Sequence, residues 1–173
     1  MLRHVQEHAD IHVTFNFTPS LLLQIKDYMS GRTTDEQFLL FKKKVEELNE
    51  KEKIQILRDF FLANWERMIG AYPRYLSLLL KRGKNIVEDE LPSVAQMFKP
   101  AEWRDLQIWS NLAWIDPIFR SEIRDLYEKG KDYREEDKIR LIDLEKKITG
   151  SIFDEYKRAF ESGQIDLTTS PMY

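Results

Sequence analysis

The chain contains no cysteine among its 173 residues, and it is poor in the residues that form turns. The absence of cysteine excludes disulfides, thiolate metal ligands and cysteine nucleophiles, and it agrees with a reducing, cytoplasmic location. Six glycines and six prolines are few for this length, because average usage is about 7% and 5%. A small sandwich or barrel of many short strands needs more turn formers, so we exclude that class.

Long apolar runs and blocks of like charge are also missing. No apolar run approaches the ~18 residues that span a bilayer, and the first eight residues carry polar and charged side chains where a signal peptide is apolar. The 27 basic and 30 acidic side chains alternate in sign along the chain. A surface that binds polyphosphates needs clustered basic residues, so we expect neither a nucleic acid nor a membrane as a partner.

Apolar residues are nevertheless numerous enough for a hydrophobic core. Hydrophobic residues make up 42% of the chain and charged residues 33%, which is typical of a folded globular domain and not of a disordered chain. The length suits one domain but falls short of the ~250 residues of a closed (β/α)₈ barrel. We therefore expect residues 1–173 to form a single, predominantly helical segment.

Glycine and proline mark the ends of the predicted helices. Glycines that follow an apolar-periodic stretch predict left-handed residues that close a helix; these are Gly31, Gly83, Gly130 and Gly163, with Gly70 as a further candidate. Five prolines stand where a helix can begin, since the first helical turn leaves the missing N–H unpaired anyway. Helices are predicted over residues 2–8, 19–30, 34–48, 49–69, 73–82, 100–114, 117–129 and 135–162.

Four residues are predicted to cap these helices. Thr34 and Asn49 are each followed three residues later by glutamine or glutamate, which is the capping-box pattern. Thr18 and Asp116 each precede a proline that can occupy the first helical position.

Two short segments predict strands, at about residues 11–16 and 164–169. The first is β-branched and aromatic and alternates with a period of two, and the second follows Gly163 at the end of the longest predicted helix. Two strands alone do not make a stable sheet. Either the helices carry the fold, or the rest of the sheet lies in sequence outside this chain.

Histidine recurs every four residues at His4, His8 and His12, a spacing that can place imidazoles on one helix face for zinc. However, His12 falls in the predicted strand beyond a helix break at Asp10, and no carboxylate follows in a ligand pattern. The chain also has no glycine-rich phosphate loop and no nucleophile elbow. We therefore assign neither a metal nor a cofactor.

Three tryptophans lie within twelve residues, at Trp103, Trp109 and Trp114. Each one taken alone is better explained as a core residue. Asn111 and Asp116 lie in the same segment, at the end of one predicted helix and the cap of the next. Aromatic faces beside amide and carboxylate groups suit sugars, whose C–H faces stack on rings while their hydroxyls need directional partners. The segment is therefore a candidate sugar-binding region.

Three segments together resemble the N-terminal part of the catalytic domain of glycoside hydrolase family 57. They are residues 11–22 (IHVTFNFTPSLL), 106–117 (LQIWSNLAWIDP) and 163–173 (GQIDLTTSPMY), and their order and spacing agree across essentially the whole chain. The resemblance implies an incomplete (β/α)₇ barrel. In that barrel, residues 11–16 and 164–169 are strands, and residues 19–162 form a helical insertion between them.

The resemblance also implies retaining action on α-linked glucans, as in the α-amylases, amylopullulanases, branching enzymes and glucanotransferases of that family. Retention requires two carboxyl groups about 5–5.5 Å apart. In the family these are a glutamate and an aspartate on later strands, and this chain has neither position. We expect the chain to begin after the family's His-Gln-Pro motif and to end before a His-Pro pair. As a fragment without catalytic residues, it is expected to be inactive alone.

The resemblance carries over four candidate substrate-binding residues. Asn16 ends a barrel-type strand, on the side where barrel active sites form, and Tyr173 follows the second strand at the same rim. Trp114 and Asp116 come from the helical region and are candidates for lining a glucan cleft. Simpler roles stay open, since Asn16 can satisfy backbone groups before Pro19 and Asp116 can cap its helix.

The expected partners follow from this interpretation. They are an α-glucan or maltooligosaccharide in the complete enzyme, and the remaining barrel portion or a second copy of the chain at the open sheet. The alternative comes from another functional class, a stand-alone helical binding or assembly module whose strands pair with another chain. Unpaired strand edges and apolar patches favour such association.

Overall fold

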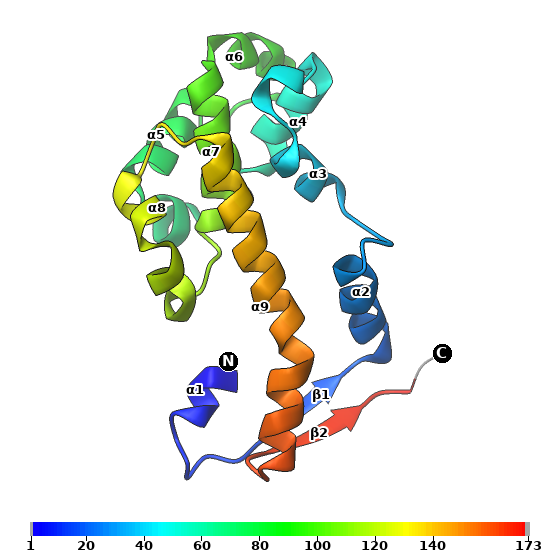
Figure 1. Cartoon of the computed structure of the whole chain (residues 1–173). Helices are drawn as coiled ribbons and strands as arrows, with labels where there is room; N and C mark the ends of the chain where they lie inside the picture. The colour runs from blue at the N-terminus through cyan, green and yellow to red at the C-terminus, as the bar shows by residue number, and fades with distance from the viewer. Residues whose placement is uncertain (1, 172–173) are drawn as a thin grey trace. The chain divides into compact units, whose positions relative to one another are not determined.

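The computed structural model describes residues 2–171 and is predominantly helical (Figure 1). The chain divides into two compact units. Unit 1 combines the residues up to Thr34 with those from Asp143 onward, whereas unit 2 is continuous from Asp35 to Ile142. The candidate Tyr173 lies outside the described residues.

Each unit has its own set of elements. Unit 1 contains α1 (Leu2–Gln6), β1 (Val13–Phe17), α2 (Pro19–Met29), the larger part of α9 (Glu135–Glu161) and β2 (Ile165–Thr169). Unit 2 contains α3 (Glu36–Lys42), η1 (Val45–Glu47), α4 (Glu50–Asp59), η2 (Trp65–Ile69), α5 (Pro73–Arg82), η3 (Glu88–Glu90), α6 (Leu91–Met97), α7 (Pro100–Leu112), η4 (Pro117–Ile123), α8 (Arg124–Lys129) and the first turns of α9. Among the described residues, no helix combines the length and the apolar character needed to cross a bilayer.

The two strands of unit 1 pair in parallel, with Val13 opposite Ile165 and Phe17 opposite Thr169. Parallel strands cannot be joined by a tight hairpin, and here the helical part of the chain connects them. Both strands lie where the sequence predicts them. However, β1 begins two residues later than predicted, because the backbone N–H of Ile11 donates to the His8 carbonyl at 3.1 Å and keeps Ile11 in a turn.

One face of this sheet is apolar and packs against helices. The rings of Phe15 and Phe17 meet Tyr156 of α9 edge-on, at centroid distances of 5.0 and 4.8 Å. Burial raises the pKa of the Tyr156 hydroxyl, and the Glu155 charge adds to this effect. The fully buried part of this small core consists of Leu2, Val5, Ala159 and Ile165.

The core of unit 2 is built around α7, which lies beside α3 and α5 (Figure 1). Trp103 and Trp109 are both 2% exposed, so these two tryptophans are core residues. The Trp109 ring stacks on Tyr72 at a centroid distance of 4.5 Å, and its indole N–H donates to the Gly130 carbonyl at 2.9 Å. The indole therefore packs through its faces while its polar atom is satisfied, as buried tryptophan requires.

A buried polar contact links α7 to the end of α3 and to α9. The carboxamide of Gln107 donates to the carbonyls of Leu40 and Lys43, at 2.7 and 3.0 Å. Its oxygen accepts from Lys138 Nζ at 2.8 Å, and that ammonium also pairs with Glu135 at 3.1 Å. Every polar atom of this contact thus has a partner, which makes its burial tolerable.

The helix caps agree with the sequence prediction in part. Asn49 and Glu52 form the predicted capping box, with bonds of 3.0 and 2.9 Å. The predicted capping role of Thr34 is wrong, because the carboxylate of Asp35 accepts the amide N–H at the start of α3, at 2.7 Å. Thr18 occupies the N-cap position of α2, but its side chain makes no capping hydrogen bond.

Several predicted helices are shorter than the sequence pattern suggested. The predicted helix 34–48 is wrong in length, because α3 ends at Lys42. Gln107 donates to the Leu40 carbonyl in the last turn of α3 and to the Lys43 carbonyl just after it, so a distant side chain replaces the next helical turn. The predicted helix 49–69 is likewise too long, because α4 stops at Asp59. There Arg82 donates to the Leu57 carbonyl and the Tyr75 hydroxyl donates to the Phe60 carbonyl.

The remaining boundaries differ less. The predicted helix 100–114 ends at Leu112, and the predicted helix 117–129 divides into η4 and α8. The four glycines predicted to close helices have positive φ angles, between 69° and 96°. Gly70 does not, with φ of −64°, and its N–H closes the π-helical turn η2 by donating to the Trp65 carbonyl.

Candidate functional site

The face of the sheet opposite to Tyr156 is polar. Because successive strand residues point to opposite faces, the side chains between the apolar positions share this second face. It carries Thr14 and Asn16 from β1, and Asp166 and Thr168 from β2, all of them exposed. The register places Thr14 opposite Asp166 and Asn16 opposite Thr168. We call these four residues the polar strand face.

Asn16 lies at the carboxyl end of β1, as the sequence predicts. Its Nδ2 donates to Ser170 Oγ at 3.3 Å, just beyond the end of β2. Since β1 and β2 are parallel, their carboxyl ends meet at one edge, the edge at which α/β folds bind ligands. The hydrogen bond of Asn16 therefore links the two strand ends.

The amino end of the polar strand face holds a histidine and a carboxylate. His12 Nε2 lies 2.9 Å from Asp166 Oδ2, and both side chains are more than half exposed. His4 instead lies beside Glu7, at 3.7 Å. Within residues 2–171, no three histidine or carboxylate side chains gather in a group that could hold a metal ion.

Trp114 differs from the other two tryptophans of its segment. It follows the end of α7, and its backbone N–H donates to the Asn111 carbonyl at 2.9 Å. Its side chain is 62% exposed, whereas Trp103 and Trp109 are buried. A large aromatic ring left in water at a helix end is available for stacking.

Asp116 lies two residues after Trp114, and the buried Ile115 anchors the turn between them. One carboxylate oxygen of Asp116 accepts the backbone N–H of Ile118 at 3.0 Å, so Asp116 caps η4 as predicted. Asn111, which the sequence places beside these groups, donates its amide to the Gln107 carbonyl at 3.2 Å. The Asn111 side chain is thus bonded to the backbone of its own helix, α7. Trp114 and Asp116 are the exposed side chains of the turn that follows α7.

The four candidate substrate-binding residues therefore do not belong to one unit of the structure. Trp114 and Asp116 come together on one turn of unit 2, Asn16 belongs to the polar strand face of unit 1, and Tyr173 is outside the described residues. Sequence reasoning missed Thr168 and Ser170 as neighbours of Asn16. The alternation of small polar residues in both predicted strands is the signal that could have found them.

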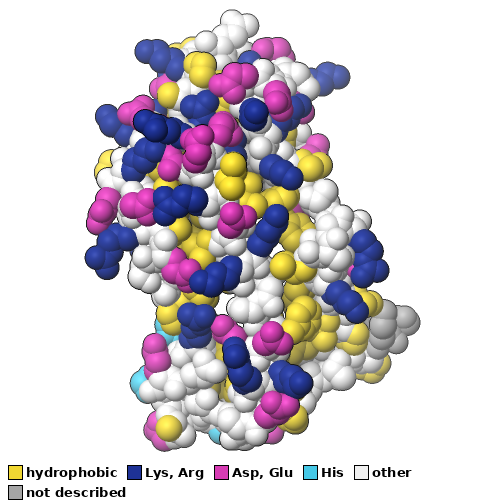
Figure 2. Space-filling view, in the orientation of Figure 1, with side chains coloured by type: hydrophobic (Ala, Val, Ile, Leu, Met, Phe, Trp, Pro, Cys, Tyr) yellow, Lys and Arg dark blue, Asp and Glu magenta, His cyan; other side chains and the backbone are white. Residues whose placement is uncertain are grey.

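Charge is evenly distributed on the face of the molecule shown in Figure 2. Lysine and arginine side chains are interspersed there with aspartate and glutamate, and no block of one sign covers this face.

Comparison of the chain with known protein families, with curated proteins and with solved structures gives no match.

Proposed function

We propose that this chain is part of the catalytic domain of an α-glucan-active, retaining glycoside hydrolase or glucanotransferase of the family 57 type. One observation carries the proposal. Asn16 and Thr168 lie opposite one another at the carboxyl ends of adjacent parallel strands, and a long helical segment joins these strands. Polar side chains at that edge are the usual substrate-binding groups of β/α barrels.

In this proposal β1 and β2 are neighbouring strands of an incomplete (β/α)₇ barrel, and the helices between them are its insertion. The two faces of the sheet support this assignment. Phe15 and Phe17 pack against Tyr156 of α9, as outward-facing barrel residues pack against helices. Thr14 and Asn16 then face the barrel interior, because they occupy the alternate positions.

We assign glucan contact to Trp114 and Asp116 as well. The exposed Trp114 ring offers a stacking face for the C–H groups of a glucose unit, and the exposed Asp116 carboxylate accepts from hydroxyls. The absence of cysteine suits the reducing cytoplasm, in which we propose that the protein acts.

Binding without cleavage is the expected behaviour of the isolated chain. Retaining hydrolysis needs a carboxylate nucleophile and a second carboxyl group as acid and base. The family resemblance assigns both groups to later strands, so we propose that this chain binds glucan and does not cleave it.

Two measurements on the purified chain test this proposal. Calorimetric titration with maltoheptaose is expected to show saturable binding that Asn16→Ala and Trp114→Ala weaken. Incubation with soluble starch is expected to release no new reducing ends. Sustained turnover would contradict the absence of catalysis, and the lack of any binding to maltoheptaose would contradict the proposed function itself.

A second candidate function is a helical assembly module that pairs with another chain. The observation that favours it is the open sheet, since among the described residues β1 pairs with β2 alone and each strand keeps one unpaired edge. Sedimentation at several concentrations tests this candidate. Concentration-dependent association supports it, and a monomer that melts cooperatively at micromolar concentration contradicts it.

A further inference from the structure

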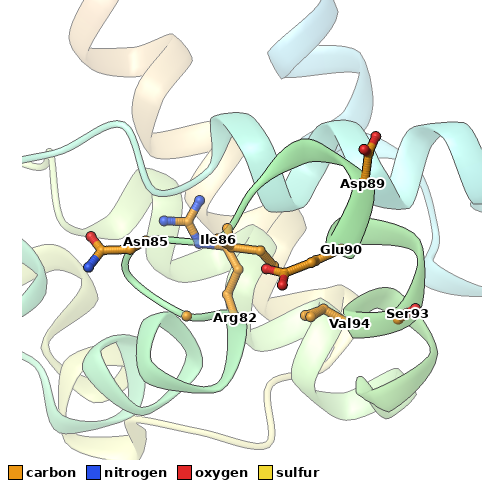
Figure 3. Close-up of a pocket in the computed structure, with 8 residues that line it drawn as sticks. Arg82, Asn85, Ile86, Asp89, Glu90, Ser93 and Val94 are labelled. Carbon is orange, nitrogen blue, oxygen red and sulfur yellow. The ribbon is translucent and has the colours of Figure 1, made fainter.

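A pocket of about 510 Å³ lies in unit 2, where the chain leaves α5 and turns through η3 into α6 (Figure 3). Its lining includes Arg82 from the end of α5, Ile86 from the following turn, Asp89 and Glu90 from η3, and Ser93 and Val94 from α6. Small-molecule sites typically measure about 300–1,000 Å³. The pocket is therefore large enough for a small organic ligand.

Arg82 is the buried cation of this pocket, and it is only 9% exposed. Its Nη1 donates to the Leu57 carbonyl at 3.1 Å, and its guanidinium carbon lies 4.9 Å from the centre of the Phe61 ring. Its Nε is buried without a hydrogen-bond partner, and no carboxylate of residues 2–171 forms an ion pair with it.

Such a buried and unpaired cation is costly. Burial lowers the pKa of Arg82, although the neighbouring Tyr75 opposes this effect. A buried charge is normally paired or fully hydrogen-bonded, and within residues 2–171 this guanidinium donates to the Leu57 carbonyl alone. An oxygen acceptor in the pocket that reaches one of its other N–H groups therefore stabilises the charge.

The carboxylates of the pocket restrict which ligand can supply that oxygen. Figure 3 shows the side chain of Glu90 directed into the pocket toward Arg82, whereas the side chain of Asp89 points away. Glu90 accepts only a long bond of 3.4 Å, from the backbone N–H of Val87. A free anion that approaches Arg82 is repelled by the Glu90 carboxylate, and a free cation is repelled by Arg82. A neutral ligand avoids both penalties.

Hydroxyl groups satisfy both kinds of partner, because each one can donate and accept. A ligand with several hydroxyls can donate to Glu90 and accept from Arg82 at the same time. The hydroxyl of Ser93 adds a further neutral polar group, and the half-buried Ile86 and Val94 offer aliphatic surface for C–H groups.

We propose that this Arg82 pocket binds a neutral polyhydroxylated ligand, namely a short α-glucan, as a second carbohydrate site. The requirement for a neutral ligand with donors and acceptors follows from the pocket. The choice of an α-glucan rests on the proposed function. The site uses none of the residues of the polar strand face or of the Trp114 turn.

The test is an NMR titration of the isotopically labelled full chain with maltotriose. The expected result is a saturable shift of the backbone amide signals of residues 82–94. Ser93→Trp places a large side chain at the pocket wall from an exposed position and is expected to weaken this binding at least about tenfold. Gln96→Trp is the matched control, because Gln96 is exposed on the same helix and is not part of the pocket lining.

A second variant, Arg82→Gln, removes the charge but keeps an N–H donor for the Leu57 carbonyl. It is expected to reduce maltotriose affinity by about tenfold, the typical effect of one lost charge-assisted hydrogen bond. Its circular dichroism spectrum and melting curve are compared with those of the unmodified chain. If Arg82→Gln fails to fold, Ser93→Trp alone decides the test.

The outcomes separate this inference from the proposed function. Shifts confined to residues near Asn16 or Trp114 overturn the pocket site and leave the proposed function standing. Shifts confined to residues 82–94 support the pocket site and contradict glucan binding at the two candidate regions. Equal affinity of Ser93→Trp and Gln96→Trp overturns the pocket site, and so does the absence of any shift.

Discussion

Lys138 Nζ lies 2.8 Å from Gln107 Oε1 inside unit 2, and neither residue is more than 2% exposed. The same ammonium donates to the Lys43 carbonyl at 3.0 Å and pairs with Glu135 at 3.1 Å. Burial lowers the pKa of Lys138, while the bond to Glu135 raises it. The contact joins the start of α9 to α7 and to the segment after α3.

Replacement of this lysine should therefore destabilise unit 2 strongly. Lys138→Met leaves the Gln107 oxygen and the Lys43 carbonyl without this donor, and a buried polar group that loses its partner typically costs about 1–3 kcal/mol. Urea unfolding measures the change in the free energy of unfolding. Lys131→Met, at an exposed position, is the control and should change it by less than about 0.5 kcal/mol. Equal unfolding midpoints for the two variants would contradict a stabilising role for the buried contact.

The N-terminus of α3 provides a test of the corrected cap. Asp35→Ala should lower the free energy of unfolding by about 1 kcal/mol, because it removes the acceptor for the amide N–H of Phe38. Thr34→Ala, one residue earlier, should have almost no effect, since Asp35 and not Thr34 caps the helix. Thermal melts of the two variants compare them directly, and the reverse order would restore the capping role first predicted for Thr34.

The lowered pKa of Glu102 makes the free energy of unfolding depend on pH. Burial raises the pKa of Glu102, but hydrogen bonds from Lys81 Nζ at 2.5 Å and from the Lys99 N–H outweigh it, so the pKa lies below its ordinary value of 4.5. Between that lowered pKa and 4.5, the unfolded chain binds more protons than the folded chain. The stabilisation is therefore complete above pH 4.5 and is lost as the pH falls through the lowered pKa.

Glu102→Gln measures this contribution. The variant should be less stable than the unmodified chain at about pH 7, by roughly 1–3 kcal/mol, and the difference should shrink at about pH 3. Glu128→Gln, an exposed substitution in the same unit, should show no such trend. A Glu102→Gln difference that stays constant with pH would show that the carboxylate does not act through its charge.

Trp114 and Trp109 should respond to truncation in opposite ways. Trp109→Ala removes a buried ring and should cost about 3–5 kcal/mol of stability. Trp114→Ala should leave stability within about 0.5 kcal/mol, because this ring is exposed, and should weaken maltoheptaose binding instead. Unfolding curves and calorimetric titration of both variants separate the two roles. Undiminished glucan affinity in Trp114→Ala would remove this residue from the proposed binding surface.

Local sequence patterns predicted those parts of the fold that depend on near neighbours. The Asn49 capping box, the Asp116 cap and the positive φ of Gly163 each involve residues within one turn, so the sequence displays their cause. Both strands were predicted for the same reason, from their alternating pattern.

The helix ends depend instead on distant side chains. Gln107 stops α3, and Arg82 binds the end of α4, across 67 and 25 positions of the chain. No window of neighbouring residues contains these partners. For the same reason the sequence pattern does not indicate the Arg82 pocket, whose lining comes from α5, the turn after it, η3 and α6. The exposure of Trp114 likewise depends on where α7 ends, which the sequence pattern does not fix.

The pairing of Val13 with Ile165 also has a consequence for biosynthesis. Unit 2 is continuous in the chain and precedes β2, so all of its residues are synthesised before β2 and leave the ribosome ahead of it. Unit 1 needs both β1 and β2, and its core cannot close until the last of its segments has been translated. Since domains generally fold as units during synthesis, the helical unit forms first, and β1 waits with an unpaired edge until its partner strand emerges.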